Sequence, residues 1–166
     1  MIKPPTDDMA EPTKIKISVQ REPFDVAAES SALSEGLSDV GAIVTFVGVC
    51  RDEGGRLDAL ELEHYPEMAE SELDRIAREA SSRWNVQAIA VIHRTGRILP
   101  KEDIVVTIAV AAHRGDAFHA SEFIMDFLKT QAPFWKKEHA AGSSEAKWVE
   151  AKATDDEAAR RWQAED

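Results

Sequence analysis

Cysteine is nearly absent from this chain of 166 residues. The single cysteine, Cys50, cannot form an internal disulfide or a cysteine-rich zinc site, which favours a reducing compartment. Long apolar runs are also missing, since no segment approaches the roughly 18–20 apolar residues that span a bilayer, and the N-terminus lacks a signal-peptide core. We therefore expect a cytoplasmic, soluble protein of one domain, without a disulfide scaffold.

Basic residues are fewer than acidic residues, and the difference varies along the chain. The sequence has 20 Lys and Arg against 31 Asp and Glu, which argues against generic binding to nucleic acids or anionic membranes. Residues 94–137 are the exception, with 7 basic and 5 acidic residues. A local positive region in a negative protein favours a cleft for a small anion or a carboxylate tail.

Several motifs for known chemistries do not occur. The chain has no glycine-rich dinucleotide or phosphate loop and no Gly-x-Ser-x-Gly elbow, so nucleotide cofactors and serine hydrolysis lack support. Its five histidines lack the close spacing of metal ligands, and we predict neither a metal nor a cofactor. Cys50 adjoins Arg51, which favours a reactive thiolate, but a cysteine in an apolar strand is more often an inert hydrophobe.

Hydrophobic periodicity and turn residues predict the elements. Residues 1–13 are rich in proline and acid, which is typical of a flexible leader, and residues 14–166 form the predicted domain. The glycines between the second and third strands predict that these two strands form a hairpin. The few helices do not alternate regularly with the strands, which indicates an α+β domain with a mixed or antiparallel sheet and two main helices. Strands are expected at 14–19, 41–50, 57–65, 86–93, 104–112 and 147–151, and helices at 25–33, 66–84 and 155–163.

A further helix, between Gly115 and the residues before Pro133, organises the candidate site. Its predicted buried face comprises Phe118, Phe123, Ile124, Phe127 and Leu128. Lys129 or Lys136 is a candidate acid, base or nucleophile, because an amine among other cations loses some preference for its charged form. Arg51 and Arg114 are candidate anion ligands. His113 is either a proton carrier or a structural residue, and Phe134 and Trp135 either stack on a planar heterocycle or belong to the core.

An ordered set of motifs resembles a known family. The motifs are VTFVG at 44–48 with Arg51, LEHYP at 62–66, VIHRTG at 91–96, AHR at 112–114, FIMDFLKT at 123–130, APFWKKE at 132–138 and WVEA at 148–151. Together they resemble the large, catalytic subunit of molybdopterin synthase, over about residues 14–162. The resemblance implies an α/β-hammerhead-type fold and a homodimer within a heterotetramer, with a small ubiquitin-like sulfur-carrier subunit at each end.

The resemblance also implies a reaction and a site. Sulfur from the carrier's C-terminal thiocarboxylate would convert cyclic pyranopterin monophosphate to molybdopterin, which contains a dithiolene. The implied substrate pocket comprises Arg51, His113, Arg114, Lys129, Lys136, Lys137 and Glu138, with Lys129 and Lys136 as leading catalytic candidates. Two positions depart from the family: Val49 replaces a frequent lysine, and Lys152 replaces an arginine. A non-catalytic adaptor for the tail of a ubiquitin-like protein and a phosphoester hydrolase are the alternative functions.

Overall fold

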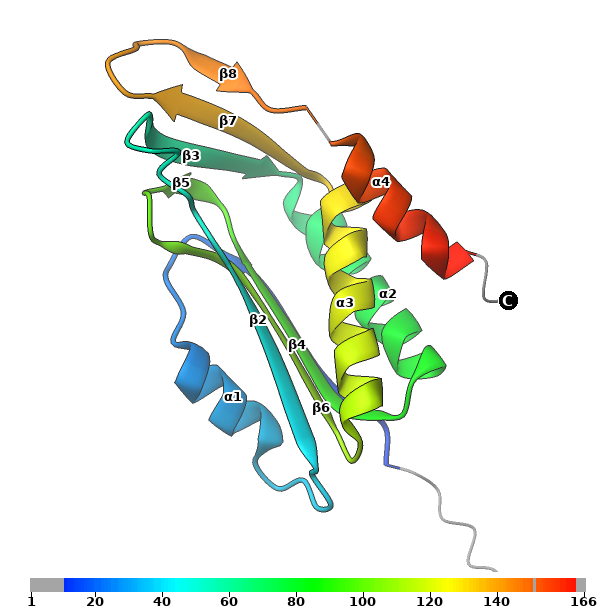
Figure 1. Cartoon of the computed structure of the whole chain (residues 1–166). Helices are drawn as coiled ribbons and strands as arrows, with labels where there is room; N and C mark the ends of the chain where they lie inside the picture. The colour runs from blue at the N-terminus through cyan, green and yellow to red at the C-terminus, as the bar shows by residue number, and fades with distance from the viewer. Residues whose placement is uncertain (1–10, 151, 164–166) are drawn as a thin grey trace, which may run out of the picture.

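The computed structural model describes residues 11–150 and 152–163, and most of the predicted leader lies outside them (Figure 1). The strands are β1 (Lys14–Gln20), β2 (Ala42–Val49), β3 (Leu57–His64), β4 (Val86–Arg94), β5 (Gly96–Ile98), β6 (Asp103–Ala111), β7 (Phe134–Ala140) and β8 (Ala146–Trp148). The helices are α1 (Val26–Ser34), α2 (Pro66–Arg83), α3 (Arg114–Thr130) and α4 (Ala153–Arg160), followed by a 3-10 turn, Arg161–Gln163. The predicted α+β single domain, with α2 and α3 as its main helices, is confirmed.

The strands form two sheets of four. The first has the order β1-β4-β6-β2, in which only β1 and β4 run parallel, and the second has the order β5-β3-β7-β8, all antiparallel. Alternate residues of β4 face opposite sides of the first sheet: Ile89 and Val91 pack under α2 and α3, whereas Ala90 and Ile92 pack under α1. The first sheet is therefore covered on both faces.

The predicted hairpin between residues 41–50 and 57–65 is wrong. β2 pairs with β6 and β3 pairs with β7, so the two strands belong to different sheets. Cys50 ends the first sheet by exchanging backbone hydrogen bonds with Lys101 and Glu102. The next loop has positive φ angles at Glu53, Gly54 and Gly55, which turn the chain into the second sheet. The paired glycines thus belong to a connection between the two sheets rather than to a hairpin turn.

Helix α3 follows the predicted periodicity with one exception. Phe123 and Ile124 are buried, and Phe127 and Leu128 are partly buried against the same core, but Phe118 is 59% exposed. Phe118 lies about 100° around the helix from the buried Ala117, since successive residues are separated by that angle. The assignment of Phe118 to the buried face was therefore wrong.

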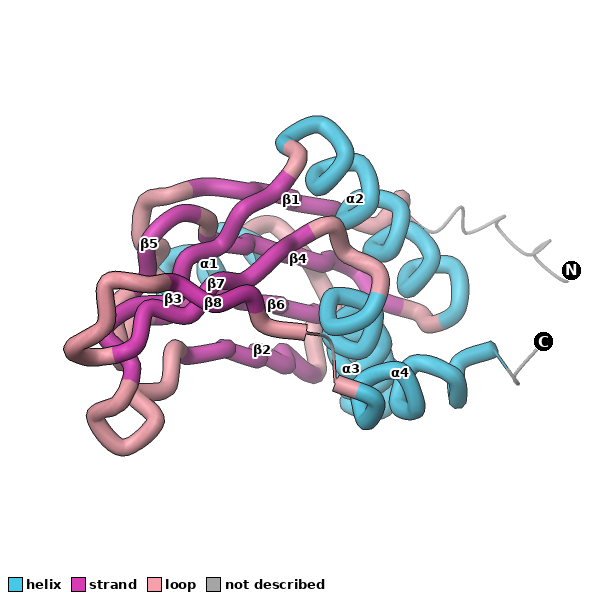
Figure 2. The backbone as a smooth tube through the Cα atoms, turned by 90° about the horizontal axis from the view of Figure 1, so that it is seen from above, coloured by secondary structure: helices cyan, strands magenta, loops and turns pink. Residues whose placement is uncertain are grey.

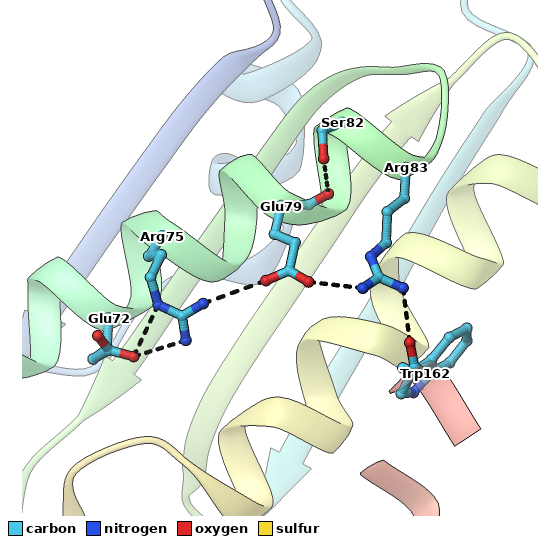
Figure 3. A network of polar contacts seen from close by, with 6 residues as sticks. All are labelled: Glu72, Arg75, Glu79, Ser82, Arg83 and Trp162. Carbon is cyan, nitrogen blue, oxygen red and sulfur yellow. Dashed lines mark hydrogen bonds and ion pairs between the residues drawn. The ribbon is translucent and has the colours of Figure 1, made fainter. Parts of the chain in front are cut away.

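The C-terminal helix is attached to α2 and α3 through side chains. Figure 3 shows the chain of contacts from Glu72 through Arg75 and Glu79 to Arg83, whose guanidinium donates to the backbone oxygen of Trp162 at 3.0 Å. The Trp162 indole N–H donates to Asp126 of α3 at 2.7 Å. Figure 2 shows α2, α3 and α4 gathered on one side of the molecule, away from β3, β5, β7 and β8. These contacts fix α4 beside the C-terminal end of α3.

None of the helices that the structure describes is long and apolar enough to cross a membrane.

Candidate functional site

Lys129 and Lys136 meet where α3 gives way to β7. Lys129 is in the last turn of α3, which ends at Thr130, and Pro133 separates the helix from β7. β7 then pairs with β3, so that Lys136 lies opposite Leu62. Strand residues alternate between faces, so Lys136 is on the same face of β7 as Phe134. This face, with Phe134, Lys136 and Glu138, is called the inner face, and the opposite face is called the outer face. The turn therefore brings a helix-end lysine and a strand lysine into one cluster.

The environment of Lys136 favours its neutral form. Burial, together with the nearby Lys129 and Lys152 charges, lowers the pKa of Lys136 from 10.5 to about 8, and Asp155 acts in the opposite direction. A pKa near 8 leaves about 10% of the amine unprotonated at pH 7, roughly 300-fold more than an unperturbed lysine would have. Lys152 and Asp155 come from the start of α4, which is held by Trp162. This site therefore contains an amine that can exchange a proton, or attack, near neutrality.

Aromatic rings lie next to the lysines on the inner face of β7. The ring of Phe134 stacks on that of His93, with centroids 3.9 Å apart and planes at 11°, and lies 6.1 Å from the ring of His64. His93 is only 7% exposed, and burial, with Lys136 and Lys129 nearby, lowers its pKa to about 4. His93 is therefore neutral at physiological pH. Phe134 packs against the core, as one of the two sequence interpretations had it.

Lys137 faces away from this cluster. Its ammonium pairs with Glu63 at 2.6 Å and lies 4.2 Å from the centroid of the Trp148 ring. Trp135 is on the same outer face, 43% exposed, in edge contact with Tyr65 at 5.2 Å. The structure therefore separates Lys137 from Lys136, although the two are neighbours in sequence.

Arg51 and Glu138 lie towards the loop that joins the two sheets. Arg51 is exposed, pairs with Glu53 at 3.4 Å, and lines a surface hollow of about 660 Å³ together with Arg56 and Lys101. Glu138 is also exposed, and its charge is near enough to help raise the pKa of Cys50. The main cause of that raised pKa is burial, since Cys50 is only 3% exposed. The Cys50 thiol is therefore not activated, in agreement with its interpretation as a small hydrophobe.

His113 and Arg114 lie at the opposite end of α3 from Lys129. Both are exposed, and His113 is the residue that precedes the helix. A helix of 17 residues is about 25 Å long, which separates this pair from the two lysines within one chain (Figure 1). Sequence reasoning placed both groups in one pocket, and the single chain does not bring them together. Among residues 11–150 and 152–163, no group of three metal-type side chains comes together either.

Comparisons with known proteins identify the family of the chain. The family model described as MoaE protein matches residues 19–131, more than half of the chain. This chain belongs to the MoaE family. The molybdopterin synthase catalytic subunit of Mesorhizobium japonicum is 60% identical over 146 residues, which is 88% of this chain and 92% of that protein. The resemblance inferred from the motifs is confirmed.

Solved MoaE structures share the fold. The Burkholderia ambifaria MoaE protein has a TM-score of 0.78 and 47% identity, and the comparison covers 91% of this chain and 99% of that one. The Staphylococcus aureus molybdopterin synthase structure has a TM-score of 0.73 and 28% identity, and covers 80% and 96%. Both agree with the two-sheet MoaE architecture described above.

Sequence reasoning missed part of the surroundings of Lys136 and Lys129. It found Lys129 and Lys136 but gave no role to His93 or Asp155, and it noted Lys152 only as a departure from the family. The sequence did contain a sign of His93, because this residue is part of the VIHRTG motif at 91–96, which covers the end of the buried strand β4. Nothing in the local sequence indicated that this strand end lies against β7, because the contact joins two different sheets.

Proposed function

We propose that this chain is the catalytic subunit of a molybdopterin synthase, converting cyclic pyranopterin monophosphate to molybdopterin. The sulfur comes from the C-terminal thiocarboxylate of a small ubiquitin-like carrier, and two transfers supply the two sulfurs of the dithiolene. The observation that carries this proposal is the half-buried Lys136 amine beside Lys129, in a chain whose MoaE relatives include molybdopterin synthase catalytic subunits. With its single buried cysteine, the protein suits the reducing cytoplasm.

The two lysines have different parts in this proposal. Lys136 is half-buried and has the lowered pKa, so it is the group that moves a proton or attacks. Lys129 is exposed at the helix end, and its positive charge suits an anionic group of the substrate or the thiocarboxylate. Arg51 and Glu138, which acts on the neighbouring Cys50, are the proposed substrate contacts on the side of the inter-sheet loop.

The placement of His113 and Arg114 constrains the assembly. A single pocket that contains these residues together with Lys129 requires a second copy of the chain, because α3 separates them by about its full length. We therefore propose a homodimer within the heterotetramer, in which the far end of α3 from one copy completes the site of the other. The pocket that we propose does not include Lys137, because its ammonium pairs with Glu63 and lies against the Trp148 ring on the outer face of β7.

The decisive experiment combines the chain with thiocarboxylated carrier and the pyranopterin precursor, and follows dithiolene formation by mass. We expect product only when all three components are present. The Lys136→Ala variant should bind the carrier and form little product, whereas Lys137→Ala is the matched control. Carrier binding by the wild type without any product would favour the adaptor function instead. Phosphate release without carrier would favour the hydrolase.

A further inference from the structure

His93 is held in a fixed orientation at the end of β4. Its Nδ1 lies 2.8 Å from the backbone oxygen of Arg94, and because a carbonyl only accepts, Nδ1 carries the proton and donates. Arg94 is itself anchored: it is 6% exposed, and its guanidinium donates to the backbone oxygens of Arg21 and Asp103, both at 3.1 Å. The ring of His93 therefore rests on a fixed backbone.

The stack with Phe134 connects this fixed ring to the catalytic strand. Phe134 is the first residue of β7, and Lys136 is two residues further along on the same face. The near-parallel contact, at 3.9 Å and 11°, restrains both the tilt and the height of the Phe134 ring. Lys136 is thus connected to the first sheet through one aromatic contact.

The neighbours of His93 are apolar within its own sheet and cationic on the side of the site. Val19 of β1 and Val105 of β6 flank it in the sheet register. The titratable groups near its ring are Lys136, Lys129 and His64. A charged imidazolium would repel the lysines, so only a neutral ring suits this position.

We propose that His93 is a positioning residue for Lys136: by stacking on Phe134 it fixes the start of β7, so that the Lys136 amine stays half-buried beside Lys129. The proposal deepens the proposed function, because it explains how the reactive amine keeps its environment. Loss of the stack would let β7 shift and water reach the amine, and Lys136 would then regain its ordinary preference for the charged form.

The test is lysine NMR on the full chain. With isotope-labelled lysine, the Lys136 side-chain signal is assigned by its absence in Lys136→Arg and titrated with pH. We expect a midpoint near 8 in the wild type. In His93→Ala it should rise by about one unit or more towards the value of free lysine, and kcat for dithiolene formation should fall about tenfold or more. His93→Phe, which keeps a neutral ring on Phe134, should retain the low midpoint.

Two further variants make the outcome unambiguous. Phe134→Leu removes the stack from the other side and should behave like His93→Ala, which covers the case that His93→Ala does not fold. His119→Ala is the matched control, because His119 stacks on Trp84 with centroids 5.9 Å apart and lies outside the lysine cluster. It should leave the Lys136 titration unchanged.

Two results would overturn the proposal. The first is an unchanged Lys136 midpoint in folded His93→Ala or Phe134→Leu. The second is a raised midpoint in folded His93→Phe, which would mean that the ring nitrogens matter and stacking does not. The NMR midpoint does not depend on turnover. If the midpoint shifts as expected while Lys136→Ala remains active, the positioning role stands and the catalytic role of Lys136 fails.

Discussion

The two faces of β7 place identical side chains in different environments. On the inner face, Lys136 is half-buried beside Lys129 and has a pKa near 8. On the outer face, Lys137 is paired with Glu63 and covered by the Trp148 ring. The two residues are adjacent in sequence and equal in chemistry. The difference teaches that the strand pleat, together with what covers each face, decides which lysine has the lowered pKa.

The largest expected effect is on catalysis at the two adjacent lysines. Lys136→Ala should lower the rate of dithiolene formation about 10²–10⁴-fold, as loss of a positioned acid-base group does. Lys137→Ala should change that rate by less than about threefold, because its ammonium is engaged on the far face. Initial rates with saturating carrier measure both, and a carrier-binding titration serves as the control. Equal losses in the two variants would remove the distinction between the faces.

The pH dependence of the rate sharpens the same comparison. If the neutral amine of Lys136 is the active form, the rate should rise about tenfold per pH unit below 8 and level off above it. Lys129→Ala removes a charge that lowers this pKa, so the remaining activity should reach its plateau at a higher pH. In Lys137→Ala the plateau of the rate should still begin near pH 8. A rate that falls above pH 8 would instead assign the ammonium form as a general acid.

His93 of β4, which stacks on the inner face of β7, and His139 on the outer face of β7 should differ in their effect on stability. His93 binds its proton near pH 6.5 in the unfolded chain and near 4 in the folded one, so stability is lost as the pH falls from 6.5 to 4. At pH 5 this loss is about 2 kcal/mol. Urea unfolding at pH 5 and 7.5 should show that His93→Phe removes this part of the pH dependence. The outer-face His139→Phe, which loses a contact with Glu61, should retain it.

The smallest expected effect concerns the ion pair that occupies Lys137. Glu63→Gln removes its partner, but Glu63 is 48% exposed in its side chain, so water screens the interaction. The free energy of unfolding should fall by no more than about 1 kcal/mol, and the catalytic rate should not change. Urea unfolding and the dithiolene assay measure the two quantities. A large loss of activity would show that the outer face takes part in the reaction.

Predictions from the sequence succeeded where structure is local. The sequence predicted α2 and α3 from their apolar periods and β4 and β6 from their apolar runs. It also identified the charged segment that contains Lys129 and Lys136. Strand β7 was missed, because its inner face carries Lys136 and Glu138 and so lacks the apolar alternation of an ordinary strand. The hairpin between 41–50 and 57–65 failed because glycines indicate a turn without specifying its partner strand.

The candidate site also has features that the sequence predicted and features that it did not. Its residue types and its cationic character could be found from composition and motifs, and the family followed from their order. The separation of His113 and Arg114 from the lysines could not be found, because proximity in sequence to α3 says nothing about which end of the helix faces the site. His93 was equally hidden, since its contact with Phe134 joins two strands of different sheets.

The sequence by itself determined the family, the α+β class, the main helices and the pair of lysines, because these depend on short-range periodicity and on ordered motifs. Only the tertiary structure decided that Lys136 and not Lys137 joins Lys129, that His93 stacks on Phe134 beside them, and that one chain leaves His113 far away. The physical reason is that burial and electrostatic shifts arise from neighbours brought together by the fold, some of them about 40 residues or more apart along the chain.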